Sequence, residues 1–209
     1  MKIISHRGLW KKRSEKNTEE SFNLSFQQGF GTETDIRDLK GKLVISHDTP
    51  IGNEMEFSNF LSLISKHTFP EPPILALNIK SDGLAHLLSE QLSGFTELDA
   101  FVFDMSIPDM QSYFQEGFQV FTRMSEVEIE AAWLEKSSGV WLDSFDNDWF
   151  TQDVVSQLLK QGKRVCIVSP ELHGRDHKNL WEEIAVLKDQ DDLILCTDHP
   201  IEAKKFFGL

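Results

Sequence analysis

The sequence lacks the features that mark membrane-spanning, secreted and nucleic-acid-binding proteins. No apolar run approaches the roughly 20 residues of a bilayer-spanning helix, and residues 1–6 become polar too early for a signal peptide. Two cysteines, Cys166 and Cys196, form no CxxC pair, so we expect buried thiols in a reducing compartment, the cytoplasm. Lys and Arg number 21 against 34 Asp and Glu, a net charge of −13, and no basic stripe extends beyond residues 11–13. Nucleic acid is therefore not an expected partner.

The composition is that of an ordinary globular protein, with 40% hydrophobic and 26% charged residues among 209. That length suffices for one domain with a sizeable core and is short for two. No internal repeat, linker or low-complexity tract divides the chain, so we predict a single domain over residues 1–209. The composition gives no indication of the oligomeric state.

Short apolar runs alternate with helix-like stretches along the whole chain, a pattern typical of βα units. Eight such runs favour a closed sheet over an open one, and we predict an α/β fold, a compact (β/α)8 TIM barrel. The predicted strands span residues 2–6, 32–36, 74–79, 100–103, 119–122, 140–142, 164–168 and 193–196.

One segment interrupts this alternation. Only seven residues separate Ile36 from the apolar pair 44–45, and a parallel crossover needs a dozen or more. The dipeptide Lys40-Gly41 is typical of a hairpin turn. We therefore predict an extra strand over residues 43–47, antiparallel to the second strand, which carries His47 toward that strand.

Polar residues gather where the first three predicted strands end, which is where barrel enzymes place their active sites. Residues two apart on a strand face the same side, so the two carboxylates of the second strand point together, as do the polar pair of the third. The hairpin adds a histidine. The set is His6, Arg7, Glu33, Asp35, His47, Asn78 and Lys80.

These residue types suit the cleavage of a phosphate ester. Two adjacent carboxylates repel each other unless a cation lies between them or one holds a proton, and oxygen ligands favour Mg²⁺ or Ca²⁺. Arg7 and Lys80 supply positive charge for a phosphoryl group. His6 and His47 offer an acid and a base near neutral pH. Each residue alone has an ordinary structural explanation, and their joint placement favours the site.

The same segments resemble the glycerophosphodiester phosphodiesterases, within the phosphatidylinositol-phospholipase-C-like phosphodiesterase superfamily. The resemblance is strongest over IISHRG, NTEESF, TETDIR and KLVISHD, which lie between residues 3 and 48. LALNIK at 75–80 and LCTDHP at 195–200 resemble later motifs of the family. The likeness thus spans the chain and is weak between residues 84 and 190.

The resemblance implies a role for each matched position. His6 and His47 would be the acid–base pair, and Arg7 and Lys80 would hold the phosphate. The substrate of such an enzyme would be a small phosphodiester of glycerol, and the products would be an alcohol and glycerol phosphate. A glycerol hydroxyl would attack the phosphorus to form a cyclic ester, which water would then open. A divalent cation, Mg²⁺ or Ca²⁺, would be held by Glu33, Asp35 and Asn78.

Two further residues are candidates for the pocket, and two positions depart from the family pattern. Arg123 and Trp141 lie near the fifth and sixth predicted strands and are expected to contact the substrate. Asn78 stands where the family has a third carboxylate, and Lys16 replaces the Glu of its Glu-Asn-Thr loop, with Glu15 one place early.

Two alternatives to the hydrolase therefore stay open. The chain could be a weakened barrel that binds a phosphate ester without efficient turnover, which Asn78 and Lys16 favour. It could also be an unrelated barrel enzyme, such as a sugar-phosphate isomerase or lyase. That enzyme would need a basic phosphate cradle after strands seven and eight, and residues 169–170 and 197–198 supply none.

Overall fold

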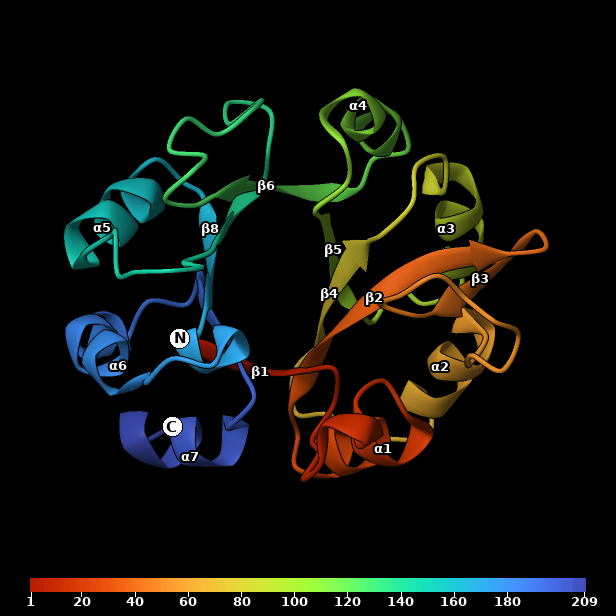
Figure 1. The fold of residues 1–209 in the computed structure, drawn as a ribbon, viewed down its shortest axis with the longest axis horizontal. Helices are drawn as coiled ribbons and strands as arrows, with labels where there is room; N and C mark the ends of the chain where they lie inside the picture. The colour runs from red at the N-terminus through yellow and green to blue at the C-terminus, as the bar shows by residue number, and fades with distance from the viewer. The chain divides into compact units, whose positions relative to one another are not determined.

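The nine strands of the structure form one hydrogen-bonded sheet in the order β1-β9-β8-β7-β6-β5-β4-β2-β3 (Figure 1). The structure is a computed structural model that describes residues 1–209. Because β1 also pairs with β2, eight parallel strands close into a barrel, and β3 is bonded outside it beside β2. The strands are β1 (Lys2–His6), β2 (Gly31–Leu39), β3 (Lys42–Ile45), β4 (Ile74–Ile79), β5 (Asp99–Phe103), β6 (Gln119–Met124), β7 (Gly139–Leu142), β8 (Arg164–Val168) and β9 (Leu193–Thr197).

Helices follow seven of the eight barrel strands, with none between β6 and β7, and this order confirms the predicted (β/α)8 barrel. None of them combines the length and the hydrophobicity that a membrane-spanning segment requires. They are α1 (Glu19–Gln27), α2 (Phe57–Ile64), α3 (Ala85–Leu92), α4 (Ile107–Gln115), α5 (Gln152–Lys160), α6 (Lys178–Ile184) and α7 (Pro200–Phe207), with short 3₁₀ turns at η1 (Arg13–Glu15), η2 (Pro170–His173) and η3 (Ala185–Leu187).

The predicted hairpin is confirmed. β3 runs antiparallel to β2, with Ile36 opposite Ile45 and Leu39 opposite Lys42. The turn is made by Lys40 and Gly41, both with positive φ, as the tight turn of a two-residue hairpin requires. The ladder extends β2 three residues past the predicted end at Ile36, because β3 supplies hydrogen-bond partners there.

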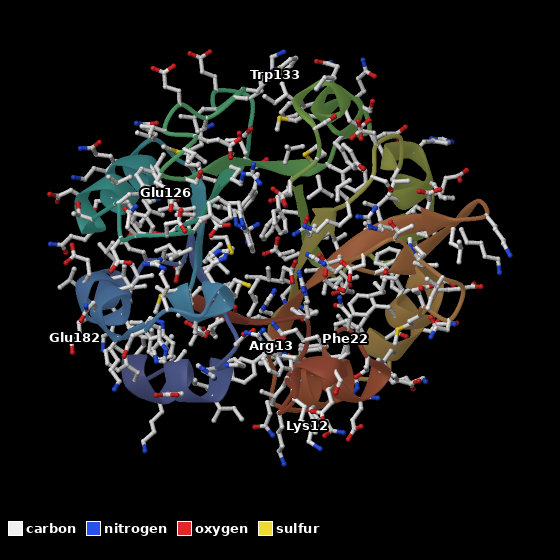
Figure 2. All side chains as sticks on the ribbon, in the orientation of Figure 1. Lys12, Arg13, Phe22, Glu126, Trp133 and Glu182 are labelled. Carbon is white, nitrogen blue, oxygen red and sulfur yellow. The ribbon has the colours of Figure 1, made fainter.

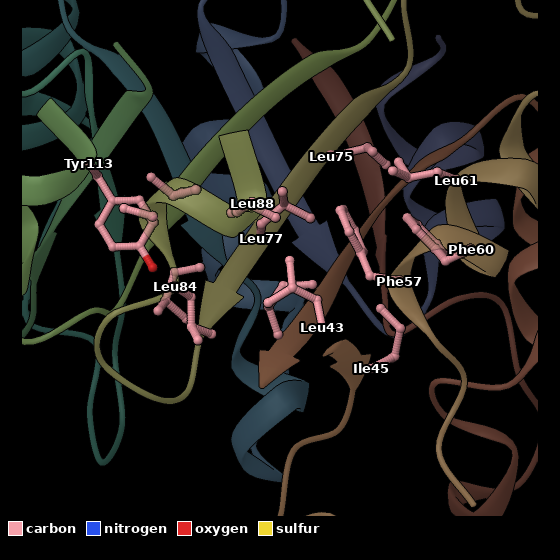
Figure 3. Packing of buried hydrophobic residues seen from close by; sticks show 14 of the residues in the cluster. Leu43, Ile45, Phe57, Phe60, Leu61, Leu75, Leu77, Leu84, Leu88 and Tyr113 are labelled. Carbon is pink, nitrogen blue, oxygen red and sulfur yellow. The ribbon is translucent and has the colours of Figure 1, made fainter. Parts of the chain in front are cut away.

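The chain divides into two compact units: Ser5–Val120, and Met1–Ile4 with Phe121–Leu209. The first has its own apolar core, in which Phe57 and Phe60 of α2 lie with Leu43, Ile45 and Leu75 (Figure 3). The second unit has a separate core around the buried Trp181. Whether the chain behaves as the predicted single domain stays a prediction.

Helix α1 shows how the sequence sets a segment that matters for the site. Thr18 caps it, accepting a hydrogen bond from the N–H of Ser21. Phe22 and Phe26, four residues apart, are buried, and the Phe22 ring meets Phe60 edge-on at 4.7 Å between centroids. The cap and this packing fix where the preceding loop ends. In the other unit, the two cysteines are buried thiols that form no disulfide, as predicted.

Candidate active site

The carboxyl end of β1 turns sharply over the first turn of α1. Arg7 has a φ of 60° and Gly8 a φ of 85°, and a Cβ on Gly8 would lie 2.7 Å from the backbone carbon of Ser21. Only glycine avoids this clash. The N–H of Gly8 donates to Thr32 Oγ1 at 3.0 Å, which ties the turn to β2. His6 and Arg7 are thereby held beside the carboxylates of that strand.

Glu33 and Asp35 of β2 are both buried, at 1% and 0% exposure. Arg7 Nε lies 2.7 Å from Asp35 Oδ2 and 4.0 Å from Glu33 Oε2. Lys80, directly after β4, places its Nζ 3.8 Å from Asp35 Oδ1. Both cations thus lie closest to Asp35, and they compensate its buried charge. Asn78 is the register partner of Asp35 on β4.

Asn17 is a site residue that the sequence did not reveal. Its Nδ2 donates to Asp35 Oδ2 at 2.9 Å, and its Oδ1 accepts from Thr34 Oγ1 at 2.9 Å. The residue has a φ of 59°, a conformation that asparagine adopts more readily than most residues. The sequence placed it in the NTEESF motif without giving it a role, and the cap of α1 is Thr18. Asn17 instead orients Asp35.

Asp104 is the second residue that was missed. It follows β5 with a φ of 69°, and Lys80 Nζ donates to its Oδ2 at 3.3 Å. Lys80 therefore lies between two acids on neighbouring strand ends. The sequence did contain a signal for this residue, because Asp104 is polar and directly follows a predicted strand. The other candidates were identified by the same rule.

The environment of Glu33 favours its protonated form. Burial, and then the negative charge of Asp35, raise the pKa of Glu33 to about 8, although Arg7, Lys80 and a hydrogen bond from Asn78 act in the opposite direction. In the absence of a further cation, Glu33 thus holds a proton at neutral pH. Binding of a cation would release that proton.

The donor atoms here fit a hard divalent cation. Glu33 Oε2 and Asn78 Oδ1 are buried without a hydrogen-bond partner, and a carboxylate and an amide oxygen are ligands that Mg²⁺ and Ca²⁺ accept. Compared with Glu33, Asp35 is less available to a cation, because Arg7 and Asn17 already contact its carboxylate. No group of three His, Cys, Asp or Glu side chains is arranged to hold a metal ion. The site therefore offers fewer charged ligands than a three-carboxylate site.

His6 is buried between Lys16 and Glu33. Its Nδ1 lies 3.4 Å from Lys16 Nζ, and its Nε2 lies 3.8 Å from Glu33 Oε2. An ammonium group can only donate, so Nδ1 accepts and the ring hydrogen of neutral His6 belongs on Nε2. Glu15 does not replace the missing Glu of the family pattern, because it accepts from the backbone N–H groups of residues 11 and 12.

His47 lies in the loop after β3 and is half exposed. The N–H of Ser46 donates to the Asp35 carbonyl at 3.1 Å, which keeps this loop against β2. The imidazole Nδ1 lies 2.9 Å from Asp48 Oδ1. The ring lines a cavity of about 880 Å³, and Arg7 is part of the same wall. The predicted extra strand thus ends before His47, which the loop carries to the cavity.

Several residues of the centre border this cavity, which lies within the Ser5–Val120 unit. Arg7, Lys16 and Asn17 line it from one side, and the loop after β3 and helix α2 from the other. A ligand in the cavity would contact Arg7, which also pairs with Asp35. A ligand bound there would therefore lie beside the candidate centre.

The remaining two predicted residues belong to the other unit. Arg123 on β6 and Trp141 on β7 are register partners. Arg123 forms an ion pair with Glu128, and Trp141 is 5% exposed. Their contact with a substrate stays a prediction.

No protein-family model and no curated protein matches the sequence. Solved structures do match. A glycerophosphodiester phosphodiesterase from Agrobacterium tumefaciens superposes with a TM-score of 0.71 over 100% of both chains, at 17% identity. A glycerophosphoryl diester phosphodiesterase from Parabacteroides distasonis gives 0.65 over 99% of this chain and 86% of the other, at 16% identity. The chain has the fold of these phosphodiesterases.

At such identities the likeness concerns the fold. It confirms the fold that the resemblance of the motifs implied, over the whole chain and including the weak central region. The residues that would carry an activity must be argued from the site itself.

Proposed function

We propose that the chain is a metal-dependent phosphoric diester hydrolase that cleaves glycerol-type phosphodiesters into an alcohol and glycerol phosphate. The observation that carries this proposal is the pairing of Arg7 with the buried Asp35 beside His6, at the wall of a cavity that His47 also lines. The shared fold of two solved phosphodiesterases supports it.

Arg7 and Lys80 bind the phosphate in this proposal. Arg7 is fixed by Asp35 and lines the cavity. The guanidinium geometry matches two phosphate oxygens. Lys80, shared between Asp35 and Asp104, adds a point charge at the strand ends. The acids hold both cations in place before the substrate arrives, so little ordering is needed on binding.

A divalent cation held by Glu33, Asp35 and Asn78 would polarise the phosphoryl oxygen and the attacking hydroxyl. The protein's own contribution is to keep two oxygen atoms unpaired for it. Glu33 Oε2 and Asn78 Oδ1 are those atoms. The raised pKa of Glu33 makes this binding compete with a proton.

His6 and His47 divide the proton transfers. His6, buried next to Glu33, accepts the proton of the glycerol hydroxyl on Nε2 as the hydroxyl oxygen attacks phosphorus. This step requires the imidazole tautomer that carries its hydrogen on Nδ1. His47 lies in the cavity wall and donates a proton to the departing alcohol oxygen. In the second half, His47 takes a proton from water as its oxygen attacks the cyclic ester, and His6 returns the proton to the glycerol oxygen. The products are the alcohol and glycerol phosphate.

A second function is a barrel that binds a phosphate ester without efficient turnover. Lys16 favours it, because its contact with His6 Nδ1 leaves the ring hydrogen on Nε2, where the base would need a lone pair. The position of Asn78 favours it too, through a weaker metal site. Phosphate binding by Arg7 and Lys80 would survive both changes.

A metal-titrated hydrolysis screen separates the two functions. Glycerophosphodiesters, phosphoinositol-type diesters and bis(p-nitrophenyl) phosphate are incubated with the protein over a range of Mg²⁺ and Ca²⁺ concentrations. The hydrolase predicts turnover of a glycerophosphodiester that chelation abolishes. Binding of glycerol phosphate with no turnover at any metal concentration would establish the binding protein instead.

A further inference from the structure

The cavity beside the candidate centre is rich in cations, although the protein is strongly acidic. Four Lys or Arg side chains and three Asp or Glu side chains line it, whereas the whole chain has 21 of the former and 34 of the latter. Two of the three acids are already engaged. Glu54 accepts from the N–H groups of Ile51 and Gly52, and Asp48 contacts His47. The lining thus has a larger share of cations than the chain as a whole.

Arg13 and Lys66 are the cations without a role in the centre. Arg13 lies in η1 and Lys66 directly after α2, and both line the cavity. Neither side chain makes a hydrogen bond or an ion pair in the structure. In Figure 2, Arg13 is labelled on the side of its segment toward the strands, and Lys12 at the outer edge. Two exposed, unpaired cations from different segments therefore line one cavity.

The other walls suit a polyol and not a quaternary ammonium group. No aromatic ring lines the cavity apart from the His47 imidazole, and aromatic faces are what recognise groups such as choline. Asn53, Asn59 and Ser62 offer amide and hydroxyl groups to hydroxylated ligands. The volume of about 880 Å³ accommodates a diester with an alcohol of sugar size.

We propose that this cavity binds the leaving-group alcohol, and that the alcohol carries a second anionic group, a phosphate or a carboxylate, held by Arg13 and Lys66. This inference rests on the proposed function, because Arg7 at the same wall is the residue that holds the phosphate to be cleaved. An anion between two unpaired cations gains charge-assisted hydrogen bonds that a neutral alcohol lacks.

Two matched substrate pairs test the proposal and distinguish the two anions. Glycerophosphoinositol 4-phosphate and glycerophosphoinositol differ by one phosphate, and glycerophosphoserine and glycerophosphoethanolamine differ by one carboxylate. We expect kcat/KM to be about ten-fold higher for the anionic member of at least one pair. The Arg13→Gln/Lys66→Gln double variant should lower that ratio to about one. Lys12→Gln, a neighbouring cation outside the cavity, is the matched control and should keep it.

For the unmodified protein, kcat/KM ratios at or below one in both substrate pairs would overturn the inference. A preference for the anionic substrate that the double variant retains would also overturn it. If no diester is cleaved at all, the proposed function fails, and the anion site is then tested alone. Calorimetry with myo-inositol 4-phosphate and with myo-inositol serves this purpose. Binding of the phosphate only, lost in the double variant and kept in Lys12→Gln, supports the site; equal or absent binding of both overturns it.

Discussion

Lys16 Nζ lies 3.4 Å from Nδ1 of His6, in a partly buried position where the related motif has a glutamate. The contact fixes more than a side-chain position. Because the ammonium donates to Nδ1, the opposite nitrogen, Nε2, carries the hydrogen and faces Glu33. A base in this site would need the other tautomer. The residue at position 16 therefore controls whether His6 can accept a proton from a substrate.

Replacement of this lysine should release the histidine. In Lys16→Glu, the carboxylate would accept from Nδ1–H, and the lone pair would move to Nε2. We expect kcat to rise by about ten-fold or more at saturating metal. Long-range ¹⁵N NMR of the imidazole reports the tautomer directly. Lys12→Glu adds the same charge on an exposed residue and is the control. A changed tautomer without a change in kcat would contradict the role given to His6.

Asn78 should limit the affinity for the metal. It would contribute an uncharged oxygen, and hard cations bind more weakly as the charge of their ligands falls. Asn78→Glu is expected to tighten Mg²⁺ or Ca²⁺ binding by about ten-fold and to raise turnover at limiting metal. Calorimetric titration of both forms measures the affinity. Equal affinities would mean that Asn78 is not beside the cation.

Glu33 should make the metal-free protein less stable as the pH rises. Its pKa is about 8 in the folded protein against 4.5 for the free side chain, so the folded state holds a proton that the unfolded state has lost. This contribution to stability is fully present below pH 4.5 and is lost as the pH rises through 8. Between pH 5 and 8 we expect the free energy of unfolding to fall by ~3 kcal/mol.

Chemical denaturation in the presence of a chelator checks this prediction. Glu33→Gln carries no titratable group and should show a flatter pH dependence than the unmodified protein. His86→Gln, an exposed substitution, is the control and should keep the slope of the free energy of unfolding against pH that Glu33 causes. Parallel pH profiles for Glu33→Gln and the unmodified protein would contradict the raised pKa.

The fold was predictable because its signals are local. The seven residues between Ile36 and Val44 are too few for a crossover, and that count alone required the hairpin that β3 forms. The runs at 2–6, 74–79 and 164–168 coincide with β1, β4 and β8. Buried parallel strands are continuous apolar runs, so their limits can be recognised in the sequence.

The contacts of the centre were only partly predictable. The spacing of Glu33 and Asp35 placed both on one side of β2, because side chains alternate along a strand. Asn17 reaches Asp35 from a loop residue with positive φ, and no periodicity describes such a residue. The contact of Lys16 with His6 depends on how the turn after β1 folds back. Both contacts depend on the path of the loop in three dimensions, which the sequence pattern does not predict.

The most direct test of the account is ³¹P NMR of glycerophosphoinositol hydrolysis by the protein with saturating Mg²⁺ or Ca²⁺. We expect glycerol phosphate as the phosphorus-containing product, no reaction with chelator, and a loss of kcat of at least roughly 100-fold in His6→Ala and in His47→Ala. The double variant should lose much less than the product of the two losses, because paired groups act as a unit. The exposed His86→Ala is the control. Glycerol phosphate released at an unchanged rate by His47→Ala would contradict the account, as would the absence of glycerol phosphate with the unmodified protein.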